Sequence, residues 1–477
     1  MTAQNILFND GWQFCLCDIG TELSALPGRH WYDVELPHDW LINDTSKLYE
    51  TGEGWYRRSL PCSAEQLSGR VLLNFDGVYM NSTLFVNGKE AGSWTYGYSA
   101  FEHDITDFLH EGENELLLRV SHQSPNTRWY SGAGIFRDVM LKLRSAAYIG
   151  TNGVYIHSAP QPEGGWTTEV ETDVVGEASD IRMLLEVFDP AGASMGGYGL
   201  EAHFDGGHEK FTSSFNSTDP ELWSVDDPML YTLKISLYSG SELLDCVNET
   251  FGYRTAEFDP DRGFLLNGEP VKLHGVCMHH DLGALGSALN EAALARQLRI
   301  MKEMGVNAIR TSHNMPARQL VQLCDEMGLL VDSEAFDMWE KPKTEFDNHR
   351  FFTEHAERDV RSWIERDRNH PCIIMWSIGN EINDTIDPHG LDITNRLYEY
   401  VLKYDPKGNA APTIGSNYMG NENAQKCSDV VKLAGYNYSE YLYDEHHAKY
   451  PGWVIYGSET ASAVRSRGIY RFPADSG

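Results

Sequence analysis

The chain has 477 residues, enough for about three domains of about 150 residues each. Its formal net charge is −32, from 38 basic and 70 acidic side chains. This balance disfavours nucleic acid or an anionic membrane as a partner, because both are bound through clustered Lys and Arg.

The N-terminus and the cysteines favour a cytoplasmic protein. Residues Met1 to Asn5 show neither the basic nor the apolar region of a signal peptide, although a trimmed chain would look the same. The eight cysteines lack metal-type spacing, so we expect them to be reduced and mostly buried. With 41% hydrophobic residues the chain can bury a core, and no apolar run reaches the roughly 18 residues that span a bilayer.

The first half of the chain is predicted to form two β-sandwiches. In residues 1–146, short alternating runs are separated by turns such as Asp76-Gly77 and Asn87-Gly88, which is typical of a sandwich. Residues 147–256 contain roughly seven short alternating runs, which fit an immunoglobulin-like sandwich. The clearest expected strands are 70–75, 82–86, 115–120, 138–143, 181–188 and 231–237.

Residues 257–477 predict a parallel β/α barrel. Apolar strands alternate here with helical stretches, of which 291–304 and 316–327 are the clearest; Gly305 and Gly328 follow them. A closed barrel needs eight strands. The sequence ends soon after the seventh, so we expect a TIM barrel without its last β/α unit and a chain that is a fragment. The expected strands are 271–276, 307–311, 329–334, 372–378, 412–416, 431–437 and 454–458.

Two glutamates stand where a barrel places its working residues, at the carboxyl ends of strands. Glu381 follows the fourth strand and Glu459 follows the seventh. Two carboxyls across a barrel mouth suit glycosidic bond cleavage, in which one protonates the leaving oxygen and the other meets the anomeric carbon. A separation of about 5–5.5 Å, which we expect here, belongs to the retaining, covalent route.

The segment Trp376-Ser377-Ile378-Gly379-Asn380-Glu381 resembles the acid/base motif of glycoside hydrolase family 2, the β-galactosidase and β-glucuronidase family. The resemblance extends over the whole chain. It implies a sugar-binding-like jelly-roll sandwich at 1–146, an immunoglobulin-like sandwich at 147–256 and an incomplete catalytic barrel at 257–477. Further segments that resemble the family are 31–40, 54–58, 75–78, 86–88, 131–139 and 264–270.

The resemblance implies a role for each matching residue. Glu381 matches the acid/base, Glu459 matches the nucleophile, and Asn380 would hold the sugar 2-hydroxyl. The other matches are His279, which would line the sugar site, Arg310 and His313 after the second strand, and Tyr438, which would assist the nucleophile. The family's usual Asn-Arg before the first of these histidines is Cys277-Met278 here.

Several of these positions have a second interpretation. The match to Tyr438 can slip to Tyr436, either tyrosine can be packing, and both histidines can be core residues. Glu334, at the end of the third strand, is either a structural partner of Arg310 or a sugar contact. Trp339 and Trp376 are a sugar platform or core, and His279 with His280 is a poor metal pair, because neighbours on a strand point to opposite faces.

The sugar is the least specified part of the prediction. Residues 459–470 look most like the β-galactosidase branch, whereas the Asn-x-Lys element of the glucuronidase branch would lie beyond Gly477. The resemblance therefore predicts a retaining, exo-acting β-glycosidase, most of all a β-galactosidase, acting on a small-molecule or oligosaccharide β-glycoside. A β-glucuronidase, another family 2 glycosidase and a non-catalytic carbohydrate-binding protein are the alternatives. We predict no cofactor from the residues; the family implies Mg²⁺ for some galactosidases, and commonly homo-oligomers.

Overall fold

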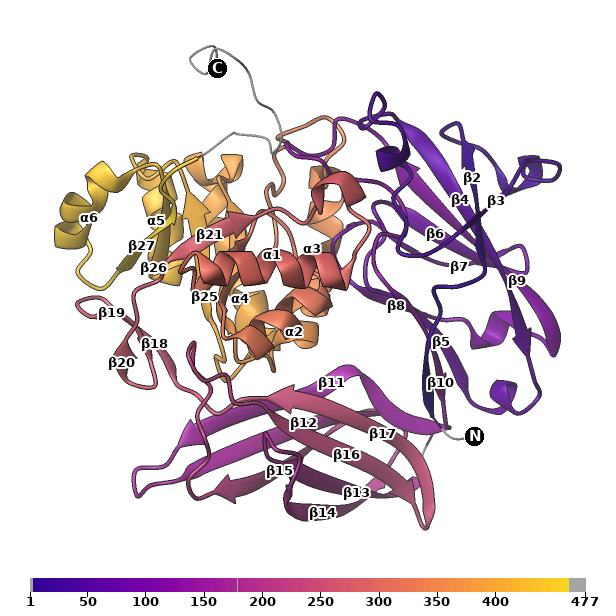
Figure 1. Cartoon of the computed structure of the whole chain (residues 1–477), viewed down its shortest axis with the longest axis horizontal. Coiled ribbons are helices and arrows are strands. Elements are labelled where there is room, and N and C mark those ends of the chain that lie inside the picture. Colours follow the sequence, from indigo (N-terminus) through magenta and orange to yellow (C-terminus); the bar gives the residue numbers. More distant parts are fainter. Residues whose placement is uncertain (1–2, 178, 463–477) are drawn as a thin grey trace.

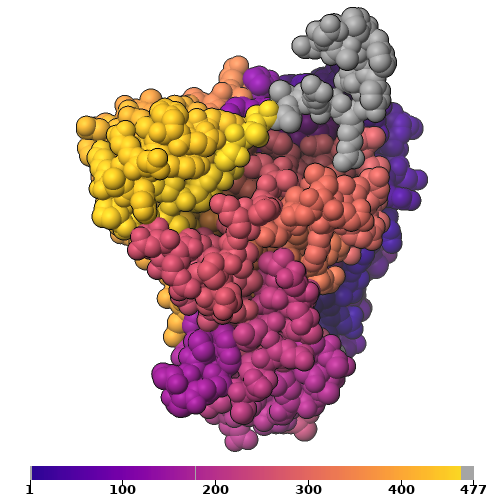
Figure 2. Space-filling view, turned by 60° about the vertical axis from the view of Figure 1, so that its left-hand side comes forward, coloured from indigo at the N-terminus to yellow at the C-terminus, as the bar shows by residue number. Residues whose placement is uncertain are grey.

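The computed structural model describes residues 3–177 and 179–462, and shows two β-sandwiches against a curled parallel β/α sheet (Figure 1). The second sandwich lies at the opposite end of the molecule from the C-terminal barrel segments (Figure 2). The domain boundaries after residues 146 and 256 remain a prediction. Among the described residues, no helix has the length and apolar character that crossing a membrane requires.

The first sandwich is built from two antiparallel sheets. Alternating side chains such as Leu73, Leu84 and Leu118 are fully buried between them, because successive residues of a strand face opposite sides. One sheet has the order β1-β10-β5-β8 and the other β3-β2-β4-β9-β6-β7. Their bounds are β1 Gln4–Leu7, β2 Trp12–Cys17, β3 Tyr32–Val34, β4 Gly52–Cys62, β5 Arg70–Phe75, β6 Ser82–Val86, β7 Lys89–Trp94, β8 Phe101–Asp104, β9 Gly112–His122 and β10 Val139–Arg144.

The second sandwich follows directly and shows the expected alternation. Ile181, Met183, Leu185 and Val187 on β13 are buried, while the residues between them are partly exposed. The sheets have the orders β11-β12-β15 and β14-β13-β16-β17. Their bounds are β11 Ala147–Pro160, β12 Trp166–Gly176, β13 Ser179–Phe188, β14 Ser194–Phe204, β15 Gly207–Ser217, β16 Tyr231–Ser239 and β17 Glu242–Phe251.

The barrel region forms one parallel sheet whose strand order, β21 to β27, follows the chain. Seven strands lie in it among the described residues, as expected for a barrel that lacks a unit. The strands are β21 Gly275–Met278, β22 Ala308–Thr311, β23 Leu330–Glu334, β24 Ile373–Asn380, β25 Ala411–Ser416, β26 Leu433–Asn437 and β27 Val454–Glu459. The helices are α1 Glu291–Glu303, α2 Arg318–Met327, α3 His349–Asp367, α4 His389–Tyr404, α5 Glu422–Val431 and α6 Tyr443–Lys449.

The first barrel strand was predicted too early, at 271–276, and begins at Gly275 instead. Residues 271–274 form no strand, and Val271 directly follows a lead-in hairpin, where its N–H donates to the Phe264 carbonyl at 3.0 Å. The strand was predicted too early because the apolar residues here are spaced as in a barrel strand. The hairpin strands are β18 Ala256–Asp259, β19 Gly263–Leu266 and β20 Glu269–Pro270.

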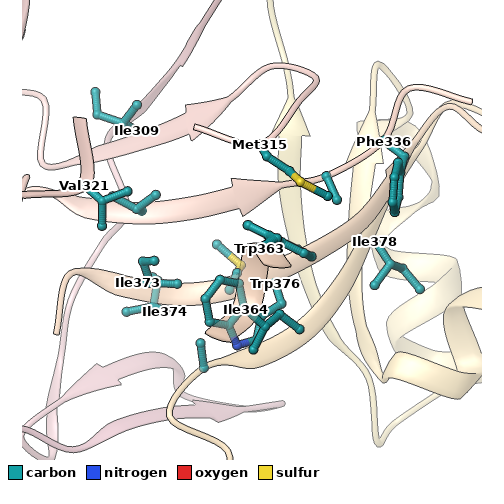
Figure 3. Close-up of a cluster of buried hydrophobic side chains, with 14 of the residues drawn as sticks. Ile309, Met315, Val321, Phe336, Trp363, Ile364, Ile373, Ile374, Trp376 and Ile378 are labelled. Atoms are coloured by element: carbon teal, nitrogen blue, oxygen red, sulfur yellow. The ribbon is translucent and has the colours of Figure 1, made fainter. Parts of the chain in front are cut away.

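The barrel core lies between the sheet and its helices. Strand β24 is buried along its whole length, as expected for a parallel strand covered on both faces. Figure 3 shows Trp376 of this strand packed beside Trp363 of α3, with ring centroids 5.0 Å apart. Because β24 is packed on both faces, Glu381, which directly follows it, has a fixed position at the end of the sheet.

Arg137, in the loop between β9 and β10, ties the first sandwich to the barrel. Its side chain is fully buried and donates to the carbonyls of Tyr98 and Met315, each at 2.9 Å. The substitution Arg137→Met would leave the two carbonyl groups without this donor. It should therefore lower the free energy of unfolding by about 2–4 kcal/mol. Urea unfolding checks this. Arg182→Met, which loses a contact with the Tyr238 ring, should change it by less than about 0.5 kcal/mol; equal losses would contradict the interpretation.

Candidate active site

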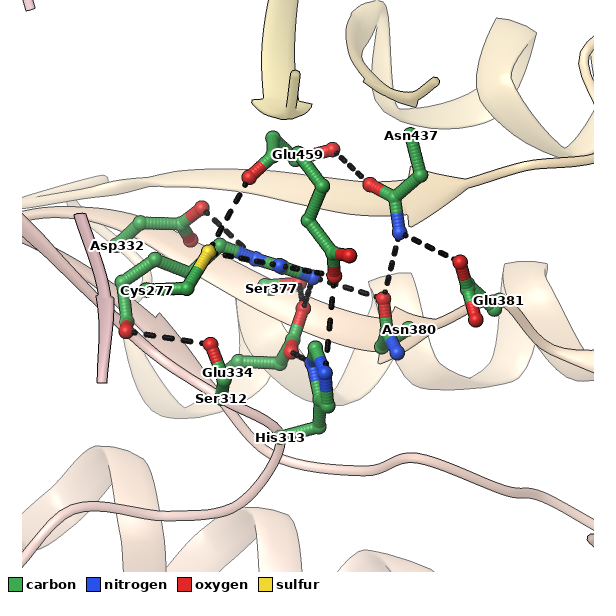
Figure 4. Close-up of polar contacts among 12 residues, drawn as sticks. Cys277, Ser312, His313, Asp332, Glu334, Ser377, Asn380, Glu381, Asn437 and Glu459 are labelled. Carbon is green, nitrogen blue, oxygen red and sulfur yellow. Dashed lines mark hydrogen bonds and ion pairs between the residues drawn. The ribbon is translucent and has the colours of Figure 1, made fainter. Parts of the chain in front are cut away.

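The two predicted carboxylates lie at the same end of the parallel sheet. Glu459 ends β27, and Glu381 follows β24 directly. Figure 4 shows their carboxyl groups on either side of the Asn380 amide. Each side chain is mostly buried, with 13% of Glu459 and 12% of Glu381 exposed. The sheet therefore brings together two residues that are far apart in the sequence.

Glu459 is surrounded by groups that stabilise its ionised form. Arg310 Nη1 donates to Oε1 at 2.8 Å, and the Tyr438 hydroxyl donates to Oε2 at 2.5 Å. Burial opposes ionisation, but the Arg310 charge and the Tyr438 hydrogen bond outweigh it and hold the pKa of Glu459 below its usual value. An ionised carboxylate that faces a partly open site is suited to act as a nucleophile.

Glu381 has different neighbours. Its Oε1 accepts from Asn437 Nδ2, and its Oε2 accepts from Arg128 Nη1, each at 3.1 Å. Its backbone adopts a positive φ of 48°, which is strained for a residue with a side chain and costs about 1–3 kcal/mol. The Glu381 N–H donates to the Gly415 carbonyl at 2.8 Å, which helps to hold this conformation and aims the side chain across the mouth.

Two amides connect the surroundings of the carboxylates. Asn380 Oδ1 accepts from Arg310 Nη2 at 2.9 Å and from Asn437 Nδ2 at 3.0 Å. Asn437 Oδ1 accepts from the Ser458 hydroxyl at 2.6 Å. Since Arg310 also contacts Glu459 and Asn437 also contacts Glu381, one network orients both carboxyl groups.

Glu334 lies beneath this network and has no exposed surface. Its Oε2 accepts from Arg310 Nη2 and from the Ser377 hydroxyl, each at 2.7 Å, and its Oε1 lies 2.7 Å from His313 Nδ1. Burial disfavours its charge, but Arg310 outweighs it and lowers the pKa of Glu334. The geometry therefore favours the structural pairing over a sugar contact.

The two predicted histidines lie beside each other, next to Glu459. The His279 and His313 rings lie 5.6 Å apart, and His313 Nε2 is 3.6 Å from Glu459 Oε1. His280 turns the other way, with Nε2 at 3.0 Å from the Ser131 carbonyl of the sandwich. Desolvation by the surrounding side chains, together with the nearby His313, lowers the pKa of His279, although the residue as a whole is exposed.

Burial distinguishes between the two tyrosine candidates and decides the role of the two tryptophans. Tyr438 is 44% exposed and reaches Glu459, whereas Tyr436 is fully buried and its hydroxyl lies 2.8 Å from His446 Nδ1. Trp339 and Trp376 have no exposed surface and donate to the Ile378 carbonyl and to Asp405, so both are core residues and not a sugar platform.

At positions 277 and 278, where the family usually has Asn-Arg, this chain has Cys277 and Met278, and the Cys277 thiol lies beside the site. Arg310 Nη1 lies 3.5 Å from Cys277 Sγ, and the thiol lies 3.4 Å from the Ser458 carbonyl. Desolvation by the surrounding side chains raises the pKa of Cys277, which favours the neutral thiol, although this cysteine, unlike most of the others, is exposed. Met278 is buried in the barrel core.

Sequence reasoning missed four residues of the site. Arg128 and Trp129 come from the loop between β9 and β10, and the Trp129 ring lies 5.2 Å from His279. Asp337 and Lys343 follow β23 and contact Asn380. Arg128 and Trp129 directly precede the motif 131–139, which was the available signal, but nothing in the sequence says that this loop reaches the barrel.

Among the described residues, those around Glu381 offer no ligand set for the Mg²⁺ that the family resemblance implies. No group of three or more His, Cys, Asp or Glu suited to a metal occurs in the described part of the chain. The acidic side chain beside Glu381, that of Asp337, is already paired with Arg128 and Lys343. We therefore derive no step through a metal ion.

Comparisons with known proteins agree with this combination of domains. Three glycosyl hydrolase family 2 models match the chain: the sugar binding domain at residues 28–144, a central domain at 154–254 and the TIM barrel domain at 260–443. The three matched domains follow one another in the same order as the two sandwiches and the barrel of the fold. The chain belongs to glycoside hydrolase family 2.

The individual relatives include two kinds of glycosidase. The chain is 36% identical to β-galactosidase BoGH2A of Bacteroides ovatus, covering 98% of this chain and 60% of the relative. A solved family 2 member from Bacteroides cellulosilyticus is 31% identical with a TM-score of 0.90, covering 96% of this chain and 61% of that one. The Bacteroides uniformis β-glucuronidase 2, solved covalently bound to cyclophellitol-6-carboxylate aziridine, is 26% identical with a TM-score of 0.81, covering 95% and 59%.

The chain thus spans about 60% of the length of these relatives. The segment that resembles the β-galactosidase branch, residues 459–470, lies largely outside the described residues, which end at 462.

Proposed function

We propose that the protein is a retaining, exo-acting β-glycosidase, with a β-galactoside as its substrate. One observation carries the proposal: two carboxyl groups at one barrel mouth share a hydrogen-bond network but have unequal neighbours. Glu459 is bonded to Arg310 and a tyrosine hydroxyl, while Glu381 is bonded to an amide and to Arg128 at the rim. Pairs of carboxyls in different environments are the usual way to divide acid/base and nucleophilic roles.

The proposed reaction has two steps. First, Glu381 gives its proton to the glycosidic oxygen, the bond to the leaving group breaks, and Glu459 forms an ester with the anomeric carbon. Water then attacks that carbon while Glu381 takes its proton, and the ester bond to Glu459 breaks. His279 and His313, beside Glu459, would contact the sugar. Asn380, predicted to hold the 2-hydroxyl, is fully buried, with its amide bonded to Arg310, Asn437 and Asp337. Trp129 packs against both histidines and would limit the site to a terminal sugar.

Galactose is preferred because BoGH2A, the relative with 36% identity, is a β-galactosidase. The glucuronidase alternative has its own support, since the Bacteroides uniformis relative is a β-glucuronidase of similar fold. A non-catalytic carbohydrate-binding protein is disfavoured, because binding a sugar needs neither an ionised Glu459 nor the strained Glu381.

A panel of aryl β-glycosides tests the proposal, with galactoside, glucuronide, glucoside, mannoside and fucoside compared by kcat/KM. It is run on the 477-residue chain and on this chain extended by the C-terminal segment of BoGH2A. We expect the galactoside to be hydrolysed with the highest kcat/KM. A preference for the glucuronide would replace galactose in the proposal, and no hydrolysis by either form would contradict the proposed activity.

Tyr438→Phe should shift the pH dependence in a defined direction. The Tyr438 hydroxyl stabilises the ionised form of Glu459, so its loss raises the pKa of Glu459. Because the nucleophile must be ionised, the acidic limb of kcat/KM should move to higher pH, and activity should be lost earlier on acidification. Tyr441→Phe, at an exposed tyrosine three residues on, is the control. An unchanged acidic limb would contradict the assistance assigned to Tyr438.

A further inference from the structure

Arg128 crosses from the first sandwich to the barrel and contacts the proposed acid/base. Its Nε and Nη2 donate to the two oxygens of Asp337, at 2.9 and 2.6 Å, and its Nη1 donates to Glu381 at 3.1 Å. A guanidinium held by a bidentate carboxylate has little freedom to rotate. The third contact is therefore made from a fixed position, although 40% of the Arg128 side chain is exposed.

Lys343 contacts Asp337 as well, and also the backbone next to Glu381. Its ammonium donates to Asp337 Oδ1 and to the Asn380 carbonyl, each at 2.8 Å, and only 7% of its side chain is exposed. Burial opposes the charge of Asp337, but the bond from Arg128 and the charge of Lys343 outweigh it and hold the pKa of Asp337 below its usual value. The two cations and Asp337 thus form one ion cluster beside the residue pair Asn380-Glu381.

We propose that Arg128 and Lys343 are positioning residues for the acid/base, with Arg128 holding the Glu381 carboxylate and Lys343 holding the backbone before it. This inference rests on the proposed function. It assigns to the first sandwich a part in the chemistry, because the sandwich supplies the cation that touches Glu381. Nothing in the family match assigns these two residues.

The position of Arg128 predicts which substrates depend on it. A leaving group of high pKa needs its proton from a well-placed Glu381, whereas a dinitrophenolate leaves without that proton. The charged and titratable groups that face Glu381 are Arg128, Lys343 and Tyr438, with Asp337 behind the two cations.

The test compares Arg128→Met with the wild type, in the form of the chain that hydrolyses the panel substrate. We expect kcat/KM to fall about 10- to 100-fold for a methyl or alkyl glycoside, and less than about threefold for the 2,4-dinitrophenyl glycoside. Arg128→Lys, which keeps the charge, should lose less than Arg128→Met on the alkyl glycoside. Lys343→Met should show the same dependence on the leaving group.

Arg358→Met is the matched control, because this arginine also bridges sandwich and barrel. It packs 3.8 Å over the Trp94 ring and donates to Thr95 at 3.1 Å, with no contact to Glu381. Equal losses on both substrates in Arg128→Met, like those of Arg358→Met, would show that Arg128 only docks the sandwich and would overturn the inference. A wild type that hydrolyses no substrate contradicts the proposed function instead, so the two failures are distinguishable.

Discussion

Glu459→Gln should lower kcat/KM for aryl β-galactosides at least about 10⁴-fold, with good and poor leaving groups alike. The amide keeps the size of the carboxylate but cannot form the ester with the anomeric carbon. The structure adds a reason to expect a large effect, because Arg310 and Tyr438 both hold this carboxylate in its ionised, reactive form. Steady-state kinetics on the 2,4-dinitrophenyl galactoside measure the loss.

A mechanism-based label locates the nucleophile independently of rate. A 2-deoxy-2-fluoro-galactosyl fluoride should form a stable ester in the wild type, found by peptide mass spectrometry on Glu459. Glu326→Gln, an exposed glutamate on α2, is the control and should keep full activity. If Glu459→Gln hydrolysed substrate at more than a tenth of the wild-type rate, or if the label lay elsewhere, the assignment would be wrong.

Glu381→Ala should lower kcat/KM by about 10²–10⁴-fold for substrates with poor leaving groups and much less for the dinitrophenyl galactoside. With that activated substrate the ester on Glu459 still forms, but no base remains to activate water. Azide needs no base, so it should attack the ester and raise the rate. The product is then the β-galactosyl azide, because two inversions give net retention.

The anomer of the azide separates the two roles. In Glu459→Ala, azide enters from the face of the missing nucleophile and gives the α-azide in a single inversion. Nuclear magnetic resonance of the two products therefore tests both assignments together. If the anomers were exchanged between the variants, the roles of Glu381 and Glu459 would be reversed; if neither variant gave an azide, covalent catalysis by this pair would be rejected.

The sequence was sufficient to predict that Glu381 and Glu459 lie at the same end of the sheet, because a parallel barrel orders its strands along the chain. Two glutamates that each follow a buried apolar strand must then lie at the same edge of the sheet. The same regularity located six barrel strands to within two residues. It failed at the first strand, where Val271 follows the lead-in hairpin, since an alternating apolar run does not show which partner strand it pairs with.

Two choices depended on burial, which a single sequence does not record. Tyr436 and Tyr438 are both candidates by position, and only the exposed one reaches Glu459. Glu334 stands at a strand end like Glu459, but it is closed off by Arg310, His313 and Ser377.

By itself, the sequence determined the order of the domains, the parallel barrel and the two carboxylates at its mouth, because these follow from local periodicity and strand order. Only the tertiary structure decided what surrounds Glu381. Arg128 lies 253 residues before it in the chain, on a loop of another domain, and no local pattern connects the two. The physical reason is that charge pairing acts through space, so the neighbours that orient an acid depend on how the sandwich packs against the barrel.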